Sequence, residues 1–392
     1  MIGISKLYLG TAEPSDVLRY GSASKKLPSH LLQFSIDKKP VVVWNMTKKC
    51  NLICTHCYSK SDAAPGEKEL DFEQGKTLID DLAEFGCPVI LFSGGEPTMR
   101  TDLPELAEYA VSKGIRAVIS TNGTLINDSM ASRLKKIGLS YVGISMDGIG
   151  ETHDKFRGVQ GAFNAAIEGM KSCKRAGLKV GLRYTITSEN TKDVPGIFEL
   201  LEKENIPRVC FYHLVYSGRG EEMMASDLSH AETRKMVDMI LDKTADLFNR
   251  GMKKEVLTVD NHADGPYIYL RMLREKNPNA ENVLKLLQMN GGNSSGYGIG
   301  CVSWDGTVYP DQFWRNHPLG NVTEKPFSKI WTDMSNDFIK SLKEKKKYVK
   351  GRCVKCRFLN VCGGNFRARG EAVTGDVWGV DPACYLTDVE IT

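Results

Sequence analysis

Three cysteines with a short, regular spacing are the residues of this sequence best suited to chemistry. Cys50, Cys54 and Cys57 follow the apolar run 41–44 at C-x3-C-x2-C spacing. Three thiolates this close can ligate three irons of a cubane iron–sulfur cluster, and because a complete cluster usually takes four cysteines, one iron is left free to bind a small molecule. A zinc site normally takes two pairs of ligands. His56 lies inside the triplet, but its position beside Cys57 makes it an awkward fourth ligand, so the pattern favours an open-iron cluster.

The elements that must position these cysteines alternate between strand and helix. Continuous apolar runs are typical of parallel strands buried on both faces, and four of the helical segments between them are followed directly by a glycine that can end a helix. This alternation indicates a parallel sheet with right-handed crossovers. Six units are too few for a closed eight-stranded barrel, so an open or partial barrel is predicted. The expected strands are 41–46, 89–92, 117–120, 141–145, 180–186 and 209–214, and the expected helices are 71–85, 102–113, 127–137, 162–176 and 193–204.

Polar residues gather where the predicted strands end. Residues 93–97 follow the second strand, 121–123 follow the third, 145–148 close the fourth, and Arg183 lies within the fifth. Ligands of parallel α/β sheets bind at the carboxyl ends of the strands. The sequence therefore predicts a binding site at this edge, next to the cysteine loop.

The cysteine triplet, followed about forty residues later by the GGEP segment 94–97, resembles the radical S-adenosylmethionine (radical SAM) superfamily. In that family the open iron chelates SAM, and an electron from the cluster splits the sulfonium to give a 5′-deoxyadenosyl radical. The core of the family is a (β/α)6 partial barrel, in agreement with the pattern of strands and helices.

The resemblance also implies which residues contact SAM. A buried ribose needs hydrogen-bond acceptors for its paired hydroxyls, and a buried carboxylate needs a cation, preferably a forked one. The alternative for each residue is a turn or a helix cap. The expected SAM contacts are Gly94, Gly95 and Glu96 at the amino group, Tyr58 at the adenine, Ser145 and Asp147 at the ribose, Arg183 at the carboxylate, and Asn122.

The chain changes character at about residue 291. A run rich in glycine and serine leads to Cys301, and the Asp305-Gly306 pair between apolar residues indicates a hairpin. The layout of cysteine, hairpin, helix and clustered cysteines resembles the SPASM/twitch extension of radical SAM enzymes, a small α+β domain with auxiliary iron–sulfur clusters. The cysteines that match the ligands of its outer cluster are Cys353, Cys356, Cys362 and Cys384.

One auxiliary cluster is expected instead of the two of the full SPASM pattern. Asp311 and Phe366 stand where that pattern has cysteines, so Cys301 is left as a possible ligand without its usual partners. Zinc is the alternative for the four-cysteine set. The expected cofactors are two [4Fe–4S] clusters and SAM.

Composition sets the broad class. A chain of 392 residues is long enough for two domains. Its net charge of +4 is too small to indicate a nucleic-acid-binding protein. No apolar run reaches the ~18 residues of a membrane span, and the N-terminus does not resemble a signal peptide. We therefore expect a cytoplasmic protein whose eleven cysteines serve as metal ligands, with no nucleic-acid or membrane partner. The expected parts are an N-terminal extension (1–37), the partial barrel (38–250), a helical linker (251–290) and the auxiliary-cluster domain (291–392).

Residues 1–21 and 27–52 resemble the tetrapyrrole-modifying branch of the superfamily, which includes NirJ, AhbC and AhbD. Chain length and the four-cysteine set are most similar to AhbC-like enzymes, which remove two acetate side chains from 12,18-didecarboxysirohaem to give iron-coproporphyrin III. AhbD-like enzymes instead decarboxylate two propionates of iron-coproporphyrin III, and NirJ-like propionate removal is a further alternative. The resemblance implies an iron tetrapyrrole substrate, a ferredoxin- or flavodoxin-type electron donor and an anaerobic host.

Such a substrate carries carboxylates and an iron, so arginines and one axial His or Cys are expected near it. The candidates are His213, Arg219, Arg367, Arg369 and Cys301. Two other classes stay open: a SPASM enzyme that modifies a peptide or protein, and a cluster- or zinc-binding scaffold without catalysis.

Overall fold

The computed structural model describes residues 1–11, 39–64 and 66–392. Most of the expected N-terminal extension (1–37) therefore lies outside the described residues. Its first part forms a short strand, β1 (Ile2–Gly3), and a helix, α1 (Ile4–Leu9). Strand β1 pairs antiparallel with β8 (Glu255–Val259), so the start of the chain is fixed to the far end of the sheet.

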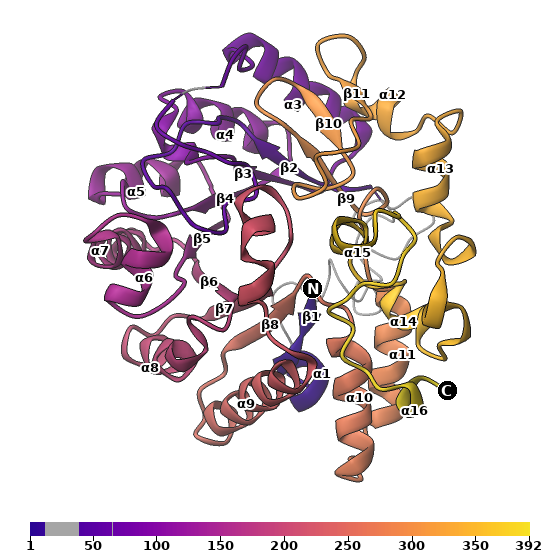
Figure 1. The fold of residues 1–392 in the computed structure, drawn as a ribbon. Helices are drawn as coiled ribbons and strands as arrows, with labels where there is room; N and C mark the ends of the chain where they lie inside the picture. Colours follow the sequence, from indigo (N-terminus) through magenta and orange to yellow (C-terminus); the bar gives the residue numbers. More distant parts are fainter. Residues whose placement is uncertain (12–38, 65) are drawn as a thin grey trace.

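The described strands form one sheet in the order β1-β8-β7-β6-β5-β4-β3-β2-β9-β10-β11. Neighbours from β2 to β8 are all parallel, and the helices between them cover the outer face (Figure 1). The strands of this parallel part are β2 (Val41–Asn45), β3 (Val89–Ser93), β4 (Arg116–Thr121), β5 (Tyr141–Ser145), β6 (Val180–Ile186), β7 (Arg208–His213) and β8. The outer helices are α3 (Phe72–Phe85), α4 (Leu103–Ser112), α5 (Asp128–Lys136), α6 (Glu151–Arg157), α7 (Ala162–Arg175), α8 (Val194–Lys203) and α9 (His230–Asn249).

The six predicted strands and five predicted helices form within one or two residues of the expected bounds. Strand β8 was missed, because residues 251–290 were expected to be a helical linker. They do contain α10 (Asp264–Arg274) and α11 (Ala280–Asn290), but β8 precedes both and is buried along its whole length. Its first residue, Glu255, faces Arg208 at 3.7 Å, which explains how a charged residue is tolerated in this position.

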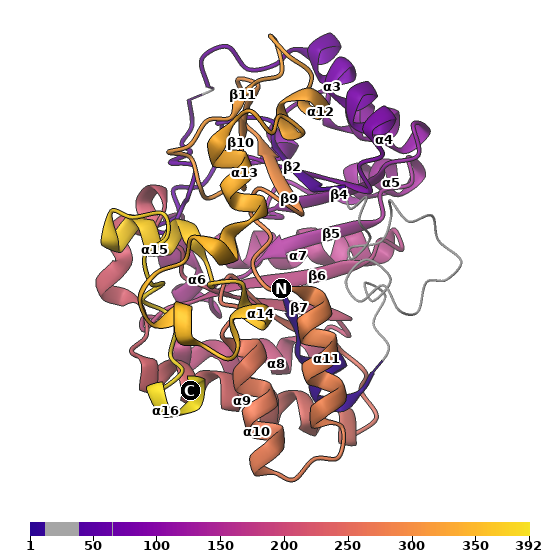
Figure 2. The ribbon, with the colours of Figure 1, turned by 90° about the vertical axis from the view of Figure 1, so that its right-hand side faces the viewer.

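The C-terminal part continues the same sheet. Strand β9 (Ile299–Val302) pairs parallel with β2, and β10 (Thr307–Tyr309) pairs antiparallel with β9, which gives the expected hairpin. Strand β11 (Gly320–Asn321) ends the sheet. Figures 1 and 2 show the C-terminal segment lying along the open side of the barrel.

The helix expected near residues 331–346 is interrupted. Two short helices, α12 (Phe327–Trp331) and α13 (Asp337–Lys343), stand in its place. The side chain of Asn336 accepts hydrogen bonds from the backbone N–H groups of Phe338 and Ile339, so α13 begins with its own cap. The remaining helices of the described chain are α14 (Leu359–Cys362), α15 (Arg367–Thr374) and α16 (Asp388–Ile391).

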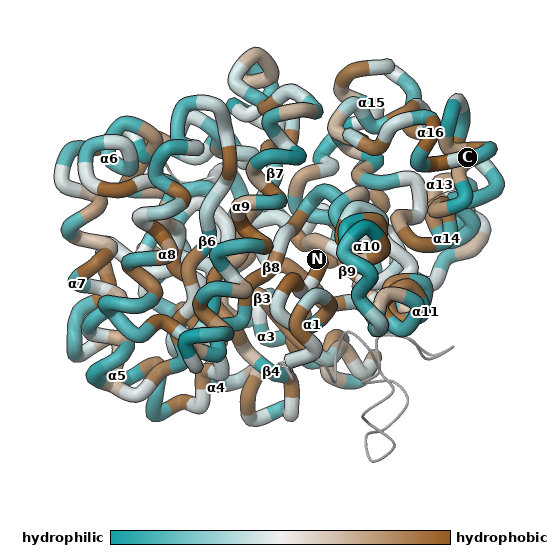
Figure 3. Tube along the Cα trace, turned by 90° about the horizontal axis from the view of Figure 1, so that it is seen from below, coloured by the Kyte–Doolittle hydropathy of each residue, from teal (hydrophilic) through white to brown (hydrophobic). Residues whose placement is uncertain are grey.

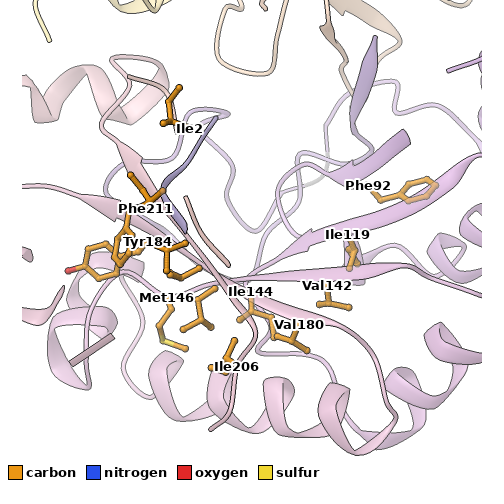
Figure 4. Packing of buried hydrophobic residues seen from close by; sticks show 14 of the residues in the cluster. Ile2, Phe92, Ile119, Val142, Ile144, Met146, Val180, Tyr184, Ile206 and Phe211 are labelled. Carbon is orange, nitrogen blue, oxygen red and sulfur yellow. The ribbon is translucent and has the colours of Figure 1, made fainter. Parts of the chain in front are cut away.

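The core lies between the parallel strands and the outer helices. Ile119, Val142, Ile144 and Val180 from neighbouring strands are buried side by side (Figure 4). The outer helices α5 and α7 carry both hydrophilic and hydrophobic segments in Figure 3, as amphipathic helices with one buried face do. No helix in the described part of the chain is long and apolar enough to cross a membrane.

Helix α7 lies directly on the turn that follows β4. A Cβ atom at Gly169 would overlap the carbonyl oxygen of Gly123. We expect Gly169→Ala to destabilise the protein by about 1–3 kcal/mol, as overpacking does, although alanine is the better helix former. Glu168→Ala, one residue earlier on the exposed face, should change stability by less than about 0.5 kcal/mol. Denaturant unfolding of both variants tests this, and an unchanged midpoint for Gly169→Ala would contradict the packing.

Candidate functional site

The cysteine loop begins directly after β2 and is held on several sides. Cys50 and Cys54 are buried and Cys57 is half-buried. The N–H of Cys50 donates to the carbonyl of Asp62 at 2.6 Å, and the N–H of Ile53 donates to the carbonyl of Arg157 at 3.1 Å. The loop is thus fixed by backbone bonds to its own return segment and to the end of α6.

Each of the three sulfur atoms accepts a hydrogen bond at 3.4 Å. The donors are the N–H of Leu52 for Cys50, the guanidinium of Arg157 for Cys54 and the N–H of Ser61 for Cys57. Such donors stabilise thiolate ligands. Burial raises the pKa of the Cys50 thiol to about 12, so the negative charge on this sulfur has to be stabilised by bound metal. These features fit an iron–sulfur cluster on Cys50, Cys54 and Cys57.

The glycines of the GGEP segment allow close approach to the cysteine loop. A Cβ atom at Gly95 would overlap the carbonyl of Lys49, and Gly94, at φ +137, has no room for one beside Thr47. The N–H groups of Gly95 and Glu96 donate to the carbonyls of Thr47 (2.7 Å) and Lys49 (2.8 Å). The loop and the end of β3 therefore form one rigid unit.

The side chain of Glu96 holds the end of β4. It is fully buried and accepts from the hydroxyl of Thr121 at 2.7 Å and from the N–H of Asn122 at 2.7 Å. Asn122 in turn donates to the side chain of Asn51 at 2.9 Å, next to Cys50. The Glu96 carboxylate therefore holds the end of β4 beside the cysteine loop, and its expected SAM contact stays a prediction.

A cavity opens at the carboxyl ends of the strands, beside the cysteine loop. Five of the predicted residues line it: Tyr58, Ser145, Asp147, Arg183 and His213. Ser93, in the segment 93–97 expected at this edge, also lines the cavity, and so does His56, which was considered only as a fourth cluster ligand. Lining residues that the sequence did not mark include Ser120, Arg157, Asp260 and Phe313.

Arg183 is placed well for an anionic ligand. It donates from Nη1 to the hydroxyl of Ser120 at 2.7 Å, while its buried Nε has no hydrogen-bond partner in the described structure. A buried donor without a partner is unfavourable. This Nε atom is enclosed beside Gly143, so other atoms of the side chain line the cavity, and the contact of Arg183 with the SAM carboxylate stays a prediction.

Asp147 is the centre of a buried ionic group. One carboxylate oxygen accepts from the N–H of Thr185 at 2.6 Å, and the other pairs with Arg157, whose second nitrogen reaches Cys54. His56 lies 3.7 Å from the same carboxylate. Arg157 could not be found from a motif, because it lies a hundred residues beyond Cys54, and only the fold brings the two together.

Three arginines expected near the substrate have structural roles instead. Arg219 donates to the carbonyls of Cys54 (2.7 Å) and Ser61 (3.1 Å), so it braces the cysteine loop. Arg367 and Arg369 are completely buried and lie outside the cavity lining. Arg367 donates to the carbonyl of Gly379, and Arg369 forms an ion pair with a buried aspartate. Sequence shows that a residue is charged but not that its charge is already neutralised.

The four C-terminal cysteines lie around a second, small cavity. Cys353, Cys356, Cys362 and Cys384 all line it. Within the described ranges no three His, Cys, Asp or Glu side chains gather closely enough to hold a single metal ion. Because all four cysteines line the same cavity, the structure brings together the set predicted to hold the auxiliary cluster.

The other residues discussed for this region lie apart from that cavity. Cys301 is buried on β9 and accepts a hydrogen bond from Asn45 at 3.5 Å, but it lines neither cavity. Asp311 accepts from the N–H groups of Phe313 and Trp314 and so orders a turn. The structure therefore does not bring Cys301 to the four-cysteine set.

Comparison with known proteins defines the class of this site. Residues 44–201 match the family model of the radical SAM superfamily, and residues 296–357 match that of the SPASM iron–sulfur cluster-binding domain. The core therefore binds a [4Fe–4S] cluster and SAM, and the extension is a further iron–sulfur domain, which decides against zinc. A solved structure of anSMEcpe with bound AdoMet has the same fold, with a TM-score of 0.68 over 88% of this chain and 93% of that one at 21% identity.

Three similar proteins indicate which branch of the superfamily the chain belongs to. The Fe-coproporphyrin III synthase of Methanosarcina barkeri is 64% identical over 100% of this chain and 99% of its own length. The pre-heme d1 synthase of Dinoroseobacter shibae is 41% identical (90% and 87%), and the AdoMet-dependent heme synthase of Oleidesulfovibrio alaskensis is 32% identical (88% and 86%). The chain belongs to the AhbC-type haem-synthesis branch of the radical SAM enzymes.

Replacing Arg157 tests the buried ionic group. Arg157→Ala leaves Asp147 buried without its cation and Cys54 without its donor, a change that typically costs about 3–5 kcal/mol. We expect lower iron content after anaerobic reconstitution and weaker SAM binding by equilibrium dialysis. Lys155→Ala, on the exposed face of the same helix, is the control and should match the wild type. Normal iron content and SAM affinity in Arg157→Ala would show that this residue does not support the site.

Proposed function

We propose that the protein removes the two acetate side chains of 12,18-didecarboxysirohaem to give iron-coproporphyrin III. The observation that supports this most is the 64% identity, along the whole chain, to a protein named Fe-coproporphyrin III synthase. The assigned SAM contacts, the cluster ligands, the domain boundaries, the ferredoxin- or flavodoxin-type donor and the cytoplasmic location stay predictions.

The balance of atoms and electrons shows why an auxiliary cluster is useful. When bound, the core cluster and SAM supply a 5′-deoxyadenosyl radical at the expense of one electron. A hydrogen atom leaves the substrate to this radical, the carbon–carbon bond to the acetate group breaks, and a ring double bond forms. The departing fragment then needs one further electron and one proton to leave as acetic acid. We assign delivery of this second electron to the cluster on Cys353, Cys356, Cys362 and Cys384.

The residues around the cavity would orient the reactants. The cationic side chain of Arg183 lines the cavity and suits the SAM carboxylate, and Tyr58 is fixed beside the cysteine loop because its hydroxyl donates to Asn45 at 2.9 Å. The ring of Tyr58 lies edge-on to Phe313 at 5.0 Å. This aromatic pair belongs to both parts of the chain, so it can exclude water where core and extension meet.

Incubating the protein with two candidate substrates tests which of them it converts. Anaerobically reconstituted protein is incubated with SAM, a low-potential reductant and either 12,18-didecarboxysirohaem or iron-coproporphyrin III, and products are identified by mass spectrometry. We expect loss of two acetate groups from the first and no change in the second. Loss of two carboxyl groups from the second would move the protein to the haem-synthase reaction. SAM cleavage without change in either compound would mean that the substrate class is wrong and would leave peptide or protein modification open.

Replacing one of the four C-terminal cysteines tests whether the auxiliary cluster delivers the second electron. Cys356→Ala should abolish release of acetic acid while 5′-deoxyadenosine still forms, because the core cluster is intact. Cys87→Ala is the matched control, since Cys87 is buried near β3, donates to the carbonyl of Pro40 at 3.0 Å and lies outside both cysteine sets. If Cys356→Ala turns over like the control, the auxiliary cluster does not deliver this electron.

A further inference from the structure

A hydrogen-bonded chain of three side chains ends in the cavity. His213 is the last residue of β7, lines the cavity and is 7% exposed. Its Nε2 lies 2.9 Å from a carboxylate oxygen of Asp264, the completely buried first residue of α10. The hydroxyl of Tyr385 donates to the other oxygen of Asp264 at 2.7 Å. Residues from the barrel, the following helix and the C-terminal extension thus meet at the Asp264 carboxylate.

The hydrogen bonds in this chain indicate which nitrogen of His213 carries the proton. The Asp264 carboxylate already accepts from the hydroxyl of Tyr385 at 2.7 Å and lies 2.9 Å from Nε2 of His213. A carboxylate can only accept, so Nε2 of His213 is the donor. An imidazole with its single proton on Nε2 has its lone pair on Nδ1. No hydrogen-bond partner of Nδ1 occurs in the part of the chain that the structure describes.

We propose that His213 binds the iron of the tetrapyrrole through Nδ1, and that Asp264 and Tyr385 position it. Metal-binding histidines almost always donate their second nitrogen to a carboxylate or carbonyl, which fixes the ring and strengthens the ligand. The arrangement of His213 and Asp264 has this form. The inference rests on the proposed function, because it requires that an iron tetrapyrrole enters the cavity.

The other candidate ligands are less suitable. His56 lines the cavity, but its Nδ1 is buried without a partner and its Nε2 faces the Asp147 carboxylate at 3.7 Å, within the cysteine loop. His262 and Cys301 are both buried, and neither residue lines the cavity. His213 therefore combines access to the cavity with an orienting carboxylate.

The C-terminal extension controls the position of this ligand. Tyr385 directly follows Cys384, one of the four cysteines around the second cavity. Asn261, three residues before Asp264, donates to the carbonyl of Ala383 at 2.9 Å. The segment that carries the auxiliary ligand therefore also holds the carboxylate that orients His213, so the cluster site and the iron site are mechanically connected.

Binding of the product provides a test that does not depend on turnover. The reconstituted holoenzyme without SAM is titrated anaerobically with iron-coproporphyrin III and, separately, with metal-free coproporphyrin III, and the absorption spectra are recorded. We expect His213→Ala to lose the spectrum of the histidine-ligated iron and to bind iron-coproporphyrin III at least about tenfold more weakly, with unchanged affinity for the metal-free compound. His230→Ala, an exposed histidine bonded to the carbonyl of Pro382, is the control.

Two further variants separate ligation from folding. In His213→Gly, added imidazole should restore the wild-type spectrum, which a misfolded variant would not do. Asp264→Asn weakens the donor character of the imidazole, so the midpoint potential of the bound iron should rise, while His213 still binds. Tyr385→Phe removes a donor from Asp264 and leaves its carboxylate a stronger acceptor, so the potential should shift in the opposite direction and by less.

The outcomes distinguish this inference from the proposed function. A wild-type spectrum and affinity in His213→Ala would overturn the assignment of the ligand, while binding of both porphyrins would leave the proposed function standing. Failure of the wild-type protein to bind either porphyrin would overturn both. An unchanged midpoint potential in Asp264→Asn would remove the positioning role of Asp264.

Discussion

The close contact between the cysteine loop and the two glycines after β3 is the constraint on which the rest of the site depends. Only residues without a Cβ let the backbone of Thr47 and Lys49 pack against Gly94 and Gly95 and exchange hydrogen bonds with them. Glu96 extends this contact to the end of β4. Three strand ends are thereby fixed relative to each other before any cofactor binds, which is the preorganisation that cluster and SAM binding require.

Buried charge is handled in two ways around the cavity. Asp147 and Arg157 neutralise each other, and hydrogen bonds to Thr185 and to the sulfur of Cys54 further offset the cost of burying two charges, while Nε of Arg157 has no partner in the described structure. Asp260, by contrast, has an unpartnered carboxylate oxygen, and burial raises its pKa to about 7. The cavity therefore combines a paired ionic group beside the cysteine loop with an acid, directly after β8, that has one carboxylate oxygen without a partner.

The local features were predictable from sequence, and the long-range ones were not. Apolar runs and caps marked β2 to β7 and their helices, and cysteine spacing marked both metal sites, because these signals lie within a few residues. Strand β8 is as long as β2, β3 and β5, but it was missed because it begins with Glu255 directly after two lysines, which hides its apolar run. The pairing of His213 with Asp264, and the burial of Arg367 and Arg369, arise from contacts between distant segments. The sequence does not show whether a charged side chain is free to bind a ligand or is already paired within the protein.

The parallel pairing of β9 with β2 also affects how the protein is made. Strand β2 carries the cysteine loop, yet its second neighbour is built from residues 299–302, far along the chain. During synthesis on the ribosome, β2 therefore remains an open sheet edge, able to pair with other chains, until nearly three hundred residues have emerged. Cluster insertion before that point would act on an unfinished sheet. The sheet that carries the cysteine loop can therefore close only after residues 299–302 have been made.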